Sequence, residues 1–146
     1  MLIGNYYNTV DNKGRVFIPA KYRYVIGERV IATKGADGCL DIFTPEAWTD
    51  YTIKNIRNRD EKDSMARQLR RFSLGWAKEL DIDKQGRINL PQELIDHAKI
   101  DKDVVFVGVG DYIEVWSVEE FEREMGPENL DPKRVMAEAT ETAVEV

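Results

Sequence analysis

The sequence predicts a mainly β protein with flanking helices, built as a pseudo-two-fold barrel from two tandem β-turn-β-helix repeats. An Asp-x-x-Gly-Arg turn occurs twice, at residues 11–15 and 83–87. The residues after each turn also match, and Pro19 and Pro91 follow the two turns at the same spacing. One such unit exposes too much apolar surface to fold alone, so each copy is expected to complete the sheet of the other.

The repetition extends well beyond the turns. After one inserted residue, Gly35 aligns with Gly108 and Phe43 aligns with Trp116. Self-similarity of this length indicates duplicated structural units. It divides the chain into a first repeat over 5–48, a helical linker over 49–75, a second repeat over 76–121 and an acidic tail over 126–146.

Each repeat is expected to contain two strand pairs and two short helices. The turn glycine tolerates the positive φ of a sharp reversal, and the proline starts a helix where its missing N–H costs nothing. Gly27 is expected to close the first of these helices, whereas Thr44 and Ser117 cap the helix that ends each repeat. The predicted strands are 6–11, 15–18, 29–34 and 39–43, then 78–83, 87–90, 103–107 and 112–116, with helices at 19–26 and 91–98.

The linker and the tail differ from the repeats. Met65, Leu69 and Phe72 recur at helical spacing, and residues 58–60 are expected to separate two linker helices. Gly126-Pro127 is predicted to end the structured part of the chain. The acidic segment that follows is poor in large apolar residues, which predicts a tail that is either mobile or weakly helical.

Composition places the chain among soluble proteins of the cytoplasm. It has 146 residues, of which 42% are hydrophobic and 33% charged, as in ordinary globular proteins. The N-terminus lacks the pattern of a signal peptide, and no apolar run is long enough to span a bilayer. Cys39 is the single cysteine, which excludes an intrachain disulfide and fits a reducing compartment.

The net charge of −6 conceals an uneven distribution. Residues 11–34 hold six basic and two acidic side chains, and residues 54–71 hold seven basic and three acidic, so each segment carries +4. Residues 114–146 hold ten acidic and three basic side chains, a net of −7. Two basic segments therefore permit a polyanionic partner in spite of the overall negative charge.

Both turns have the composition of a self-capped hairpin. Asp11 and Asp83 are expected to accept backbone N–H groups across the turn. Gly14 and Gly86 relieve the strain of the reversal. These four residues are therefore predicted to organise the turns, whatever the arginines do.

The arginines allow two interpretations. In the first, Arg15 and Arg87 simply pair with the turn aspartates, and duplication has preserved a structural contact. In the second, pseudo-symmetry places both guanidinium groups on one face. There they offer planar donors to phosphate or to the major-groove edge of guanine, and a two-stranded ribbon is narrow enough to enter that groove.

The motifs resemble those of the MraZ family, whose members are transcriptional regulators with two SpoVT-AbrB-type repeats. The resemblance rests on the tandem Asp-x-x-Gly-Arg turns followed by aliphatic-x-aliphatic-Pro. It also rests on Gly-x-x-Gly-Cys-Leu in the first half and Val-Gly-Val-Gly-Asp-x-Ile-Glu-Val-Trp in the second. It extends from the N-terminus to about residue 125. The acidic tail departs from the family's compact pattern and either weakens DNA binding by competition or has no effect on it.

This resemblance implies a swapped-hairpin or double-split β-barrel and a ring of identical subunits. It further implies a nucleoid-associated protein that binds short direct repeats of double-stranded DNA in a promoter. For the family, that promoter typically drives the division and cell-wall gene cluster that begins with the regulator's own gene. The roles carried over are DNA binding for Arg15 and Arg87, their positioning by Asp11 and Asp83, and phosphate contacts for Lys13 and Lys84.

Other kinds of site find little support in the sequence. Cys39 and His97 are the only conventional nucleophile–base pair, and nothing in their spacing brings them together. One His, one Cys and scattered carboxylates give no metal-ligand spacing. Gly108 and Gly110 are expected at a hairpin tip rather than in a nucleotide-binding loop. The sequence therefore predicts no catalytic residues, metal, cofactor or small-molecule substrate.

Several alternatives remain open at this stage. The chain is expected to be a DNA-binding regulator, but an oligomeric protein-interaction or antitoxin-like barrel has the same repeats. An enzyme would require a pocket that joins Cys39 to His97. The basic segment 67–71 is interpreted as a solvated helix face in preference to a second phosphate contact. Three aromatic residues are expected in the core or at a subunit interface, namely Trp48, Trp76 and Trp116.

Overall fold

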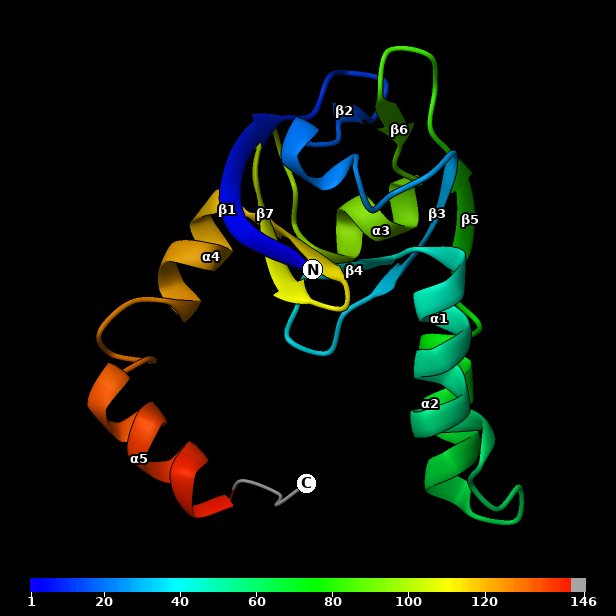
Figure 1. The fold of residues 1–146 in the computed structure, drawn as a ribbon, viewed down its shortest axis with the longest axis vertical. Helices are drawn as coiled ribbons and strands as arrows, with labels where there is room; N and C mark the ends of the chain where they lie inside the picture. Colours follow the sequence, from blue (N-terminus) through cyan, green and yellow to red (C-terminus); the bar gives the residue numbers. More distant parts are fainter. Residues whose placement is uncertain (143–146) are drawn as a thin grey trace.

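Most of the chain is organised around one large antiparallel sheet. The computed structural model describes residues 1–142. Six strands form the sheet in the order β1-β7-β8-β4-β3-β5, and β2 and β6 form a separate two-stranded ribbon (Figure 1). The strands are β1 (Leu2–Thr9), β2 (Arg15–Phe17), β3 (Arg29–Lys34), β4 (Leu40–Phe43), β5 (Lys78–Asp81), β6 (Arg87–Asn89), β7 (Asp103–Gly110) and β8 (Ile113–Ser117).

The two repeats exchange strands throughout. β1 of the first repeat pairs with β7 of the second, so that Tyr6 lies opposite Phe106. In return, β5 of the second repeat pairs with β3 of the first. The ribbon joins β2 to β6 and sets Val16 opposite Ile88. The prediction that each half completes the sheet of the other is confirmed by this pairing.

The predicted barrel is wrong in one respect, since the six-stranded sheet is open and does not close into a barrel. Within residues 1–142, β1 and β5 are the two ends of the sheet and do not pair with each other. β5 has only four residues, and three of them are charged. A short, charged edge strand does not recruit a further strand, so the sheet ends there instead of closing.

The core lies between the sheet and the ribbon, since buried residues of both belong to one cluster. It contains matched residues from the two repeats, such as Val16 with Ile88 and Tyr22 with Leu94, all of them fully buried. Phe106, at the centre of β7, is also fully buried. Burying an aliphatic or aromatic side chain of this size contributes about 1.5–3 kcal/mol, so a single core shared by both repeats holds the exchanged strands together.

The helix after each ribbon strand differs between the repeats. In the first repeat, the predicted helix over 19–26 shrinks to a 3₁₀ turn, η1 (Ala20–Tyr22), whereas the second forms α3 (Gln92–His97). The first sequence contains two tyrosines and a valine, which are weaker helix formers than the Gln-Glu-Leu of the second. Because the turn ends early, the prediction that Gly27 closes a helix is wrong, and Gly27 has no positive φ.

The linker forms a helical hairpin that projects from the sheet, here called the helical arm (residues 45–73). It comprises α1 (Pro45–Thr52), the π-helical turn η2 (Ile53–Arg57) and α2 (Ser64–Ser73). The predicted break between two linker helices is confirmed. Thr44 caps α1, since its hydroxyl accepts the N–H of Ala47 at 3.1 Å. Figure 1 shows the arm extending away from the ribbon.

The C-terminal segment continues beyond the predicted stop. α4 (Val118–Glu124) is capped by Ser117, whose hydroxyl accepts the N–H of Glu120 at 3.1 Å. A further helix, α5 (Pro132–Thr142), follows Gly126-Pro127, so the prediction that structure ends there is wrong. Of the two alternatives for the tail, the structure has the helical one. Residues 143–146, the end of the predicted tail, lie outside the described part of the chain.

A helix that crosses a bilayer needs about 20 consecutive, mostly apolar residues. Among the described residues, no helix combines the length and the apolar character that crossing a bilayer requires.

Replacement of Phe106 by alanine tests the shared core. Because the side chain is fully buried where both repeats meet, F106A is expected to lower the free energy of unfolding by about 3–5 kcal/mol. Urea denaturation followed by circular dichroism measures the change. The control, Tyr7→Ala on β1, removes an exposed aromatic ring. A loss below about 1 kcal/mol for F106A would contradict the shared core.

Candidate functional site

The first Asp-x-x-Gly-Arg turn is closed by its aspartate. One carboxylate oxygen of Asp11 accepts the backbone N–H groups of Lys13 and Arg15, each at 2.9 Å. The other oxygen accepts the Nε–H of Arg15 at 2.8 Å. The backbone closes the hairpin independently, because Asp11 N–H donates to the carbonyl of Arg15 at 2.9 Å. One carboxylate therefore fixes both the turn and the arginine.

The second turn repeats this geometry. Asp83 accepts the backbone N–H groups of Gln85 and Arg87 at 2.9 Å, and the Nε–H of Arg87 at 2.8 Å. The backbone bond from Asp83 to Arg87 is again 2.9 Å long. The expected roles of both aspartates as turn acceptors are thus present in the structure.

Both turn glycines adopt conformations that other residues rarely accept. Gly14 has φ +82° and Gly86 has φ +89°. A Cβ on Gly14 would come within 2.9 Å of the Leu90 carbonyl oxygen, and a Cβ on Gly86 would collide with the guanidinium of Arg23. Glycine is therefore required for backbone conformation and for the close approach of neighbouring groups.

The ribbon ties the two turns to each other. The N–H of Ile18 donates to the carbonyl of Gly86 at 2.9 Å, and the N–H of Leu90 donates to the carbonyl of Gly14 at 2.8 Å. Each turn is thus hydrogen-bonded to the strand that follows the other turn. Figure 1 shows both turns at the same end of the molecule, opposite the helical arm.

The register of the ribbon places both arginines on its outer face. Arg15 lies opposite Asn89, and Phe17 lies opposite Arg87. Alternate residues of a strand share a face, and the intervening Val16 and Ile88 are buried in the core. The four flanking side chains therefore point outward together: Arg15, Phe17, Arg87 and Asn89.

Each guanidinium group is hydrogen-bonded to its aspartate through Nε, whereas its terminal nitrogens face outward. The side chains of Arg15 and Arg87 are 35% and 23% exposed. Each uses Nε for its aspartate, and within residues 1–142 neither has a hydrogen bond from its two terminal nitrogens. Both terminal nitrogens can therefore donate to an external planar acceptor, the geometry that suits phosphate and the guanine edge.

The aspartates remain ionised at neutral pH. The backbone N–H of Arg15, together with its side chain, holds the pKa of Asp11 below the usual value of 3.8. The backbone N–H and side chain of Arg87 lower the pKa of Asp83 in the same way. Hydrogen bonds to a carboxylate favour its charged form, so each arginine is oriented by a permanent negative charge.

The two turns are not equivalent, and the sequence interpretation missed this difference. Arg23 lies over the second turn and donates to the carbonyls of Gln85 and Gly86 at 3.2 and 3.3 Å. At the first turn its place is taken by Ile95, which lies 72 residues later and comes near Gly14. The basic composition of 11–34 was the only signal in the sequence that pointed to Arg23.

The neighbours of the two arginines also differ. The guanidinium of Arg87 lies 5.8 Å from the ring centroid of Phe17, a distance at which a cation interacts with an aromatic face. Arg15 lies opposite Asn89, which is not aromatic and cannot make the equivalent contact. Lys13 and Lys84 are both exposed, but they occupy the third and second positions of their turns. The two lysines therefore occupy non-equivalent positions in their turns.

The structure does not assemble Cys39 and His97 into a reactive pair. His97 Nε2 lies 3.0 Å from the carbonyl oxygen of Gly35, and Cys39 Sγ lies 3.7 Å from a carboxylate oxygen of Asp41. Neither lines the nearby cavity of about 180 Å³ beside Asp41 and Tyr112. Within residues 1–142 the two side chains are hydrogen-bonded to different groups and not to each other.

The carboxylates are less scattered than the sequence suggested. Asp41 and Glu114 lie opposite each other on β4 and β8, and Cys39 joins them within 4.8 Å. Burial and the Glu114 charge raise the pKa of Asp41 to about 7, and burial raises the pKa of the Cys39 thiol. A metal ligand must be deprotonated, so the raised pKa values of Asp41 and Cys39 oppose metal binding, and this cluster alone does not define a metal site.

The tryptophans have three different environments. Trp116 is buried and packs edge-on against Phe121. Trp48 lies partly buried against Phe43. Trp76 is 39% exposed, with the ammonium of Lys34 at 3.4 Å from the centroid of its ring. The expected core position thus holds for Trp116.

Comparisons with known proteins agree with the repeat structure. The family model described as "MraZ protein, putative antitoxin-like" matches residues 1–71 and 74–129. The "Transcriptional regulator MraZ" of Thermoanaerobacter sp. (strain X514) is 47% identical over 122 residues, covering 84% of this chain and 85% of that protein. The protein of the same name from Caldicellulosiruptor saccharolyticus is 40% identical over 144 residues, covering 99% and 100%.

The fold and the site define a class of tandem-repeat proteins that present paired Asp–Arg turns on a shared ribbon. With a family model across both repeats and relatives aligned over nearly their whole length, the chain belongs to the MraZ family.

Replacement of a turn glycine tests the backbone argument. G14A is expected to lower the free energy of unfolding by about 1–2 kcal/mol, because an L-residue is forced to positive φ and meets the Leu90 carbonyl. G27A is the matched control, since a Cβ at Gly27 meets nothing within 4 Å. Chemical denaturation measures both variants. Equal stability of G14A and G27A would rule out the strained turn.

Acid titration tests the turn aspartates. Their pKa values are lowered on folding, so the stability they contribute is present above the unfolded pKa of about 3.9 and is lost as pH falls through the folded pKa. Carboxyl-carbon NMR is expected to show Asp11 and Asp83 titrating below 3.8. The D11N/D83N variant is expected to lose less stability than the wild type between pH 5 and pH 2, values that bracket about 3.9. Normal titration of both carboxyls would contradict the geometry.

Proposed function

We propose that this protein is a sequence-specific, non-enzymatic DNA-binding transcriptional regulator that acts on direct repeats in a promoter. The observation that carries the proposal is the pair of outward-facing guanidinium groups, Arg15 and Arg87, on one narrow ribbon. The name shared by the relatives supports regulation of transcription. The resemblance described above extends the proposal to a promoter of division and cell-wall genes that includes the protein's own gene.

In this mechanism the ribbon enters the major groove of DNA. A two-stranded ribbon fits that groove, and arginine recognises guanine through two parallel hydrogen bonds to O6 and N7. Asp11 and Asp83 bind Nε and leave the two terminal nitrogens for the base. The aspartates thus act as positioning residues, while Arg15 and Arg87 read the sequence.

The lysines contribute phosphate contacts and do not read bases. Lys13 and Lys84 are exposed beside the arginines and contact the phosphate backbone. Such contacts contribute affinity without sequence information and make binding depend strongly on salt. Arg23 holds the second turn against the ribbon through the carbonyls of Gln85 and Gly86.

The assembly of several subunits raises the affinity for DNA. The pairing of strands between the repeats supports a swapped-hairpin arrangement. The proposed active form is a ring of identical subunits that is associated with the nucleoid in the cytoplasm. One small ribbon binds weakly, so neighbouring subunits on consecutive repeats raise the affinity through effective concentration. No cofactor, metal or small-molecule substrate takes part in this proposal.

Arginine variants test the reading of DNA. R15A is expected to weaken binding to a cognate repeat by about 1–3 kcal/mol, and R15A/R87A to abolish the preference for cognate over scrambled repeats. A mobility-shift assay with the DNA upstream of the protein's own gene measures both. R29A is the matched control, because Arg29 is an exposed cation on β3, ion-paired with Glu79 at 2.6 Å.

The outcome separates the proposal from its competitor. Undiminished, salt-resistant binding by R15A/R87A would refute the mechanism. The description of the matched family as antitoxin-like favours one other function, an oligomeric protein-interaction module. If the intact assembly shifts the mobility of no upstream DNA, the protein-interaction function is favoured.

A further inference from the structure

The two strands of the ribbon present different chemistry at one pair of equivalent positions. β2 and β6 correspond to each other in the two repeats, so that position 17 matches position 89. The arginines that begin the strands are identical, and the buried residues that follow them are both aliphatic. The outward-facing third residue is Phe17 in one strand and Asn89 in the other. The pseudo-two-fold symmetry of the outer face is therefore broken within the strands at this pair.

Phe17 exposes an aromatic ring that the orientation of an arginine does not require. The residue is 46% exposed, and its ring centroid lies 5.8 Å from the guanidinium of Arg87. Arg15 has no aromatic residue opposite it, yet its Nε lies at the same 2.8 Å from an aspartate oxygen as the Nε of Arg87. Exposed apolar area does not stabilise the folded chain. The ring therefore leaves an apolar surface beside Arg87 for a partner to cover.

Asn89 exposes an amide beside the first turn. A Cβ on Gly14 would come within 3.1 Å of the side-chain oxygen of Asn89, and Arg15 is its partner across the ribbon. Asn89 is exposed, and within residues 1–142 its side chain makes no hydrogen bond. A side-chain amide has two N–H donors and one carbonyl acceptor. Both kinds of group are therefore available to an external partner next to Arg15.

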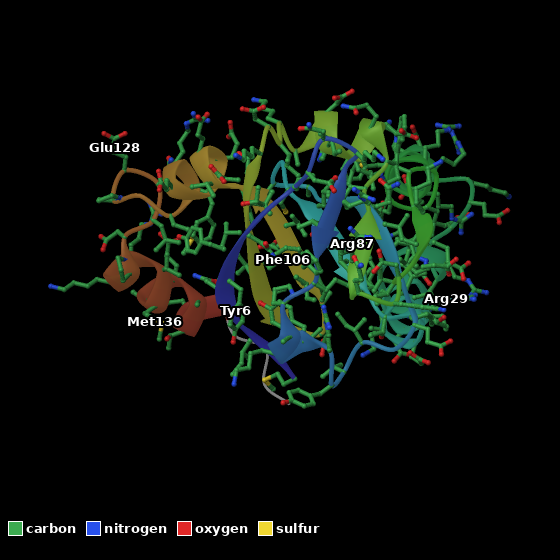
Figure 2. The ribbon with its side chains drawn as sticks, turned by 90° about the horizontal axis from the view of Figure 1, so that it is seen from above. Tyr6, Arg29, Arg87, Phe106, Glu128 and Met136 are labelled. Carbon is green, nitrogen blue, oxygen red and sulfur yellow. The ribbon has the colours of Figure 1, made fainter. Side chains whose placement is uncertain are left out.

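The spacing of these side chains matches the spacing of bases. Figure 2 looks onto the end of the molecule that carries the ribbon and shows Arg87 near the middle of the view. Cross-strand neighbours have Cβ atoms about 4.5–5.5 Å apart, and successive bases are about 3.4 Å apart along a DNA strand. An arginine and the residue opposite it therefore reach neighbouring base pairs. In the major groove, asparagine binds N6 and N7 of adenine, and phenylalanine contacts the methyl group of thymine.

We propose that Phe17 and Asn89 are specificity-determining residues that give the ribbon a direction on DNA. Asn89 binds an adenine next to the guanine read by Arg15, and Phe17 contacts a thymine methyl next to the guanine read by Arg87. A recognition element that is alike at both ends reads an inverted repeat, whereas a ribbon with different ends distinguishes the two directions of a direct repeat. This inference rests on the proposed function, because it requires the ribbon to enter the major groove.

Removal of each side chain tests its base contact in the full chain. Competition fluorescence anisotropy measures binding to a one-repeat duplex from the DNA upstream of the protein's own gene, with each base pair replaced in turn. N89A is expected to lose discrimination on the order of tenfold at one A·T pair. F17A is expected to lose a preference of about fourfold for thymine over deoxyuridine, which lacks only the methyl group. Both variants are expected to keep the preference for guanine.

Variants that make the two ends of the ribbon alike provide the sharper test. N89F places phenylalanine at both ends, and the base pair preferred next to the guanine of Arg15 is expected to change from A·T to T·A. F17N places asparagine at both ends and is expected to invert the preferred pair next to the guanine of Arg87. A new preference at one defined base pair cannot arise from a loss of folding. Both variants are therefore informative even if their overall affinity is lower.

The controls come from the helical arm, at the other end of the molecule (Figure 1). N58A removes an exposed amide and M65A an exposed apolar side chain, and both are expected to keep the wild-type base preferences. Guanine discrimination with unchanged neighbouring preferences in N89F and F17N would overturn this inference alone. An equal loss of affinity on every duplex by F17A and N89A would also overturn it. A wild type that does not discriminate guanine would refute the proposed function, and this inference with it.

Discussion

The carboxylate of a turn aspartate accepts two backbone N–H groups and the Nε–H of the arginine four residues later, and this happens twice in the molecule. Without it, a long and flexible arginine at the surface would lose considerable rotamer entropy on binding. With it, the guanidinium is fixed before any ligand arrives. The direction of Arg15 and Arg87 depends on this one acceptor, which also reinforces hairpins that the backbone closes by itself.

Much of the fold follows from local signals in the sequence. β3 was predicted with its observed bounds, because a β-rich stretch ends at a glycine turn. The twin turns were predicted to the residue, since aspartate supplies the acceptor and glycine the backbone conformation that such a sharp reversal requires. Repetition then indicated that the halves share a sheet. These predictions needed no knowledge of distant contacts.

Other features depend on distant contacts and were not predictable in the same way. The open sheet results from the order of strands that lie far apart in the chain. Arg23, directly after η1, reaches the second turn, and Asp41 meets Glu114 only because β4 pairs with β8. The length of the helix predicted over 19–26 was overestimated. A segment that is helical in one copy of a repeat need not be helical in the other. Duplication predicts topology more reliably than it predicts local conformation.

The exchange of strands also determines when the protein can fold during synthesis. β1 consists of residues 2–9, but its partner β7 extends to Gly110. The first strand therefore leaves the ribosome long before its partner exists, and most of the chain must be made before the sheet can form. Because each repeat supplies strands to the other, neither repeat is a folding unit, and the molecule gains or loses its structure as a whole.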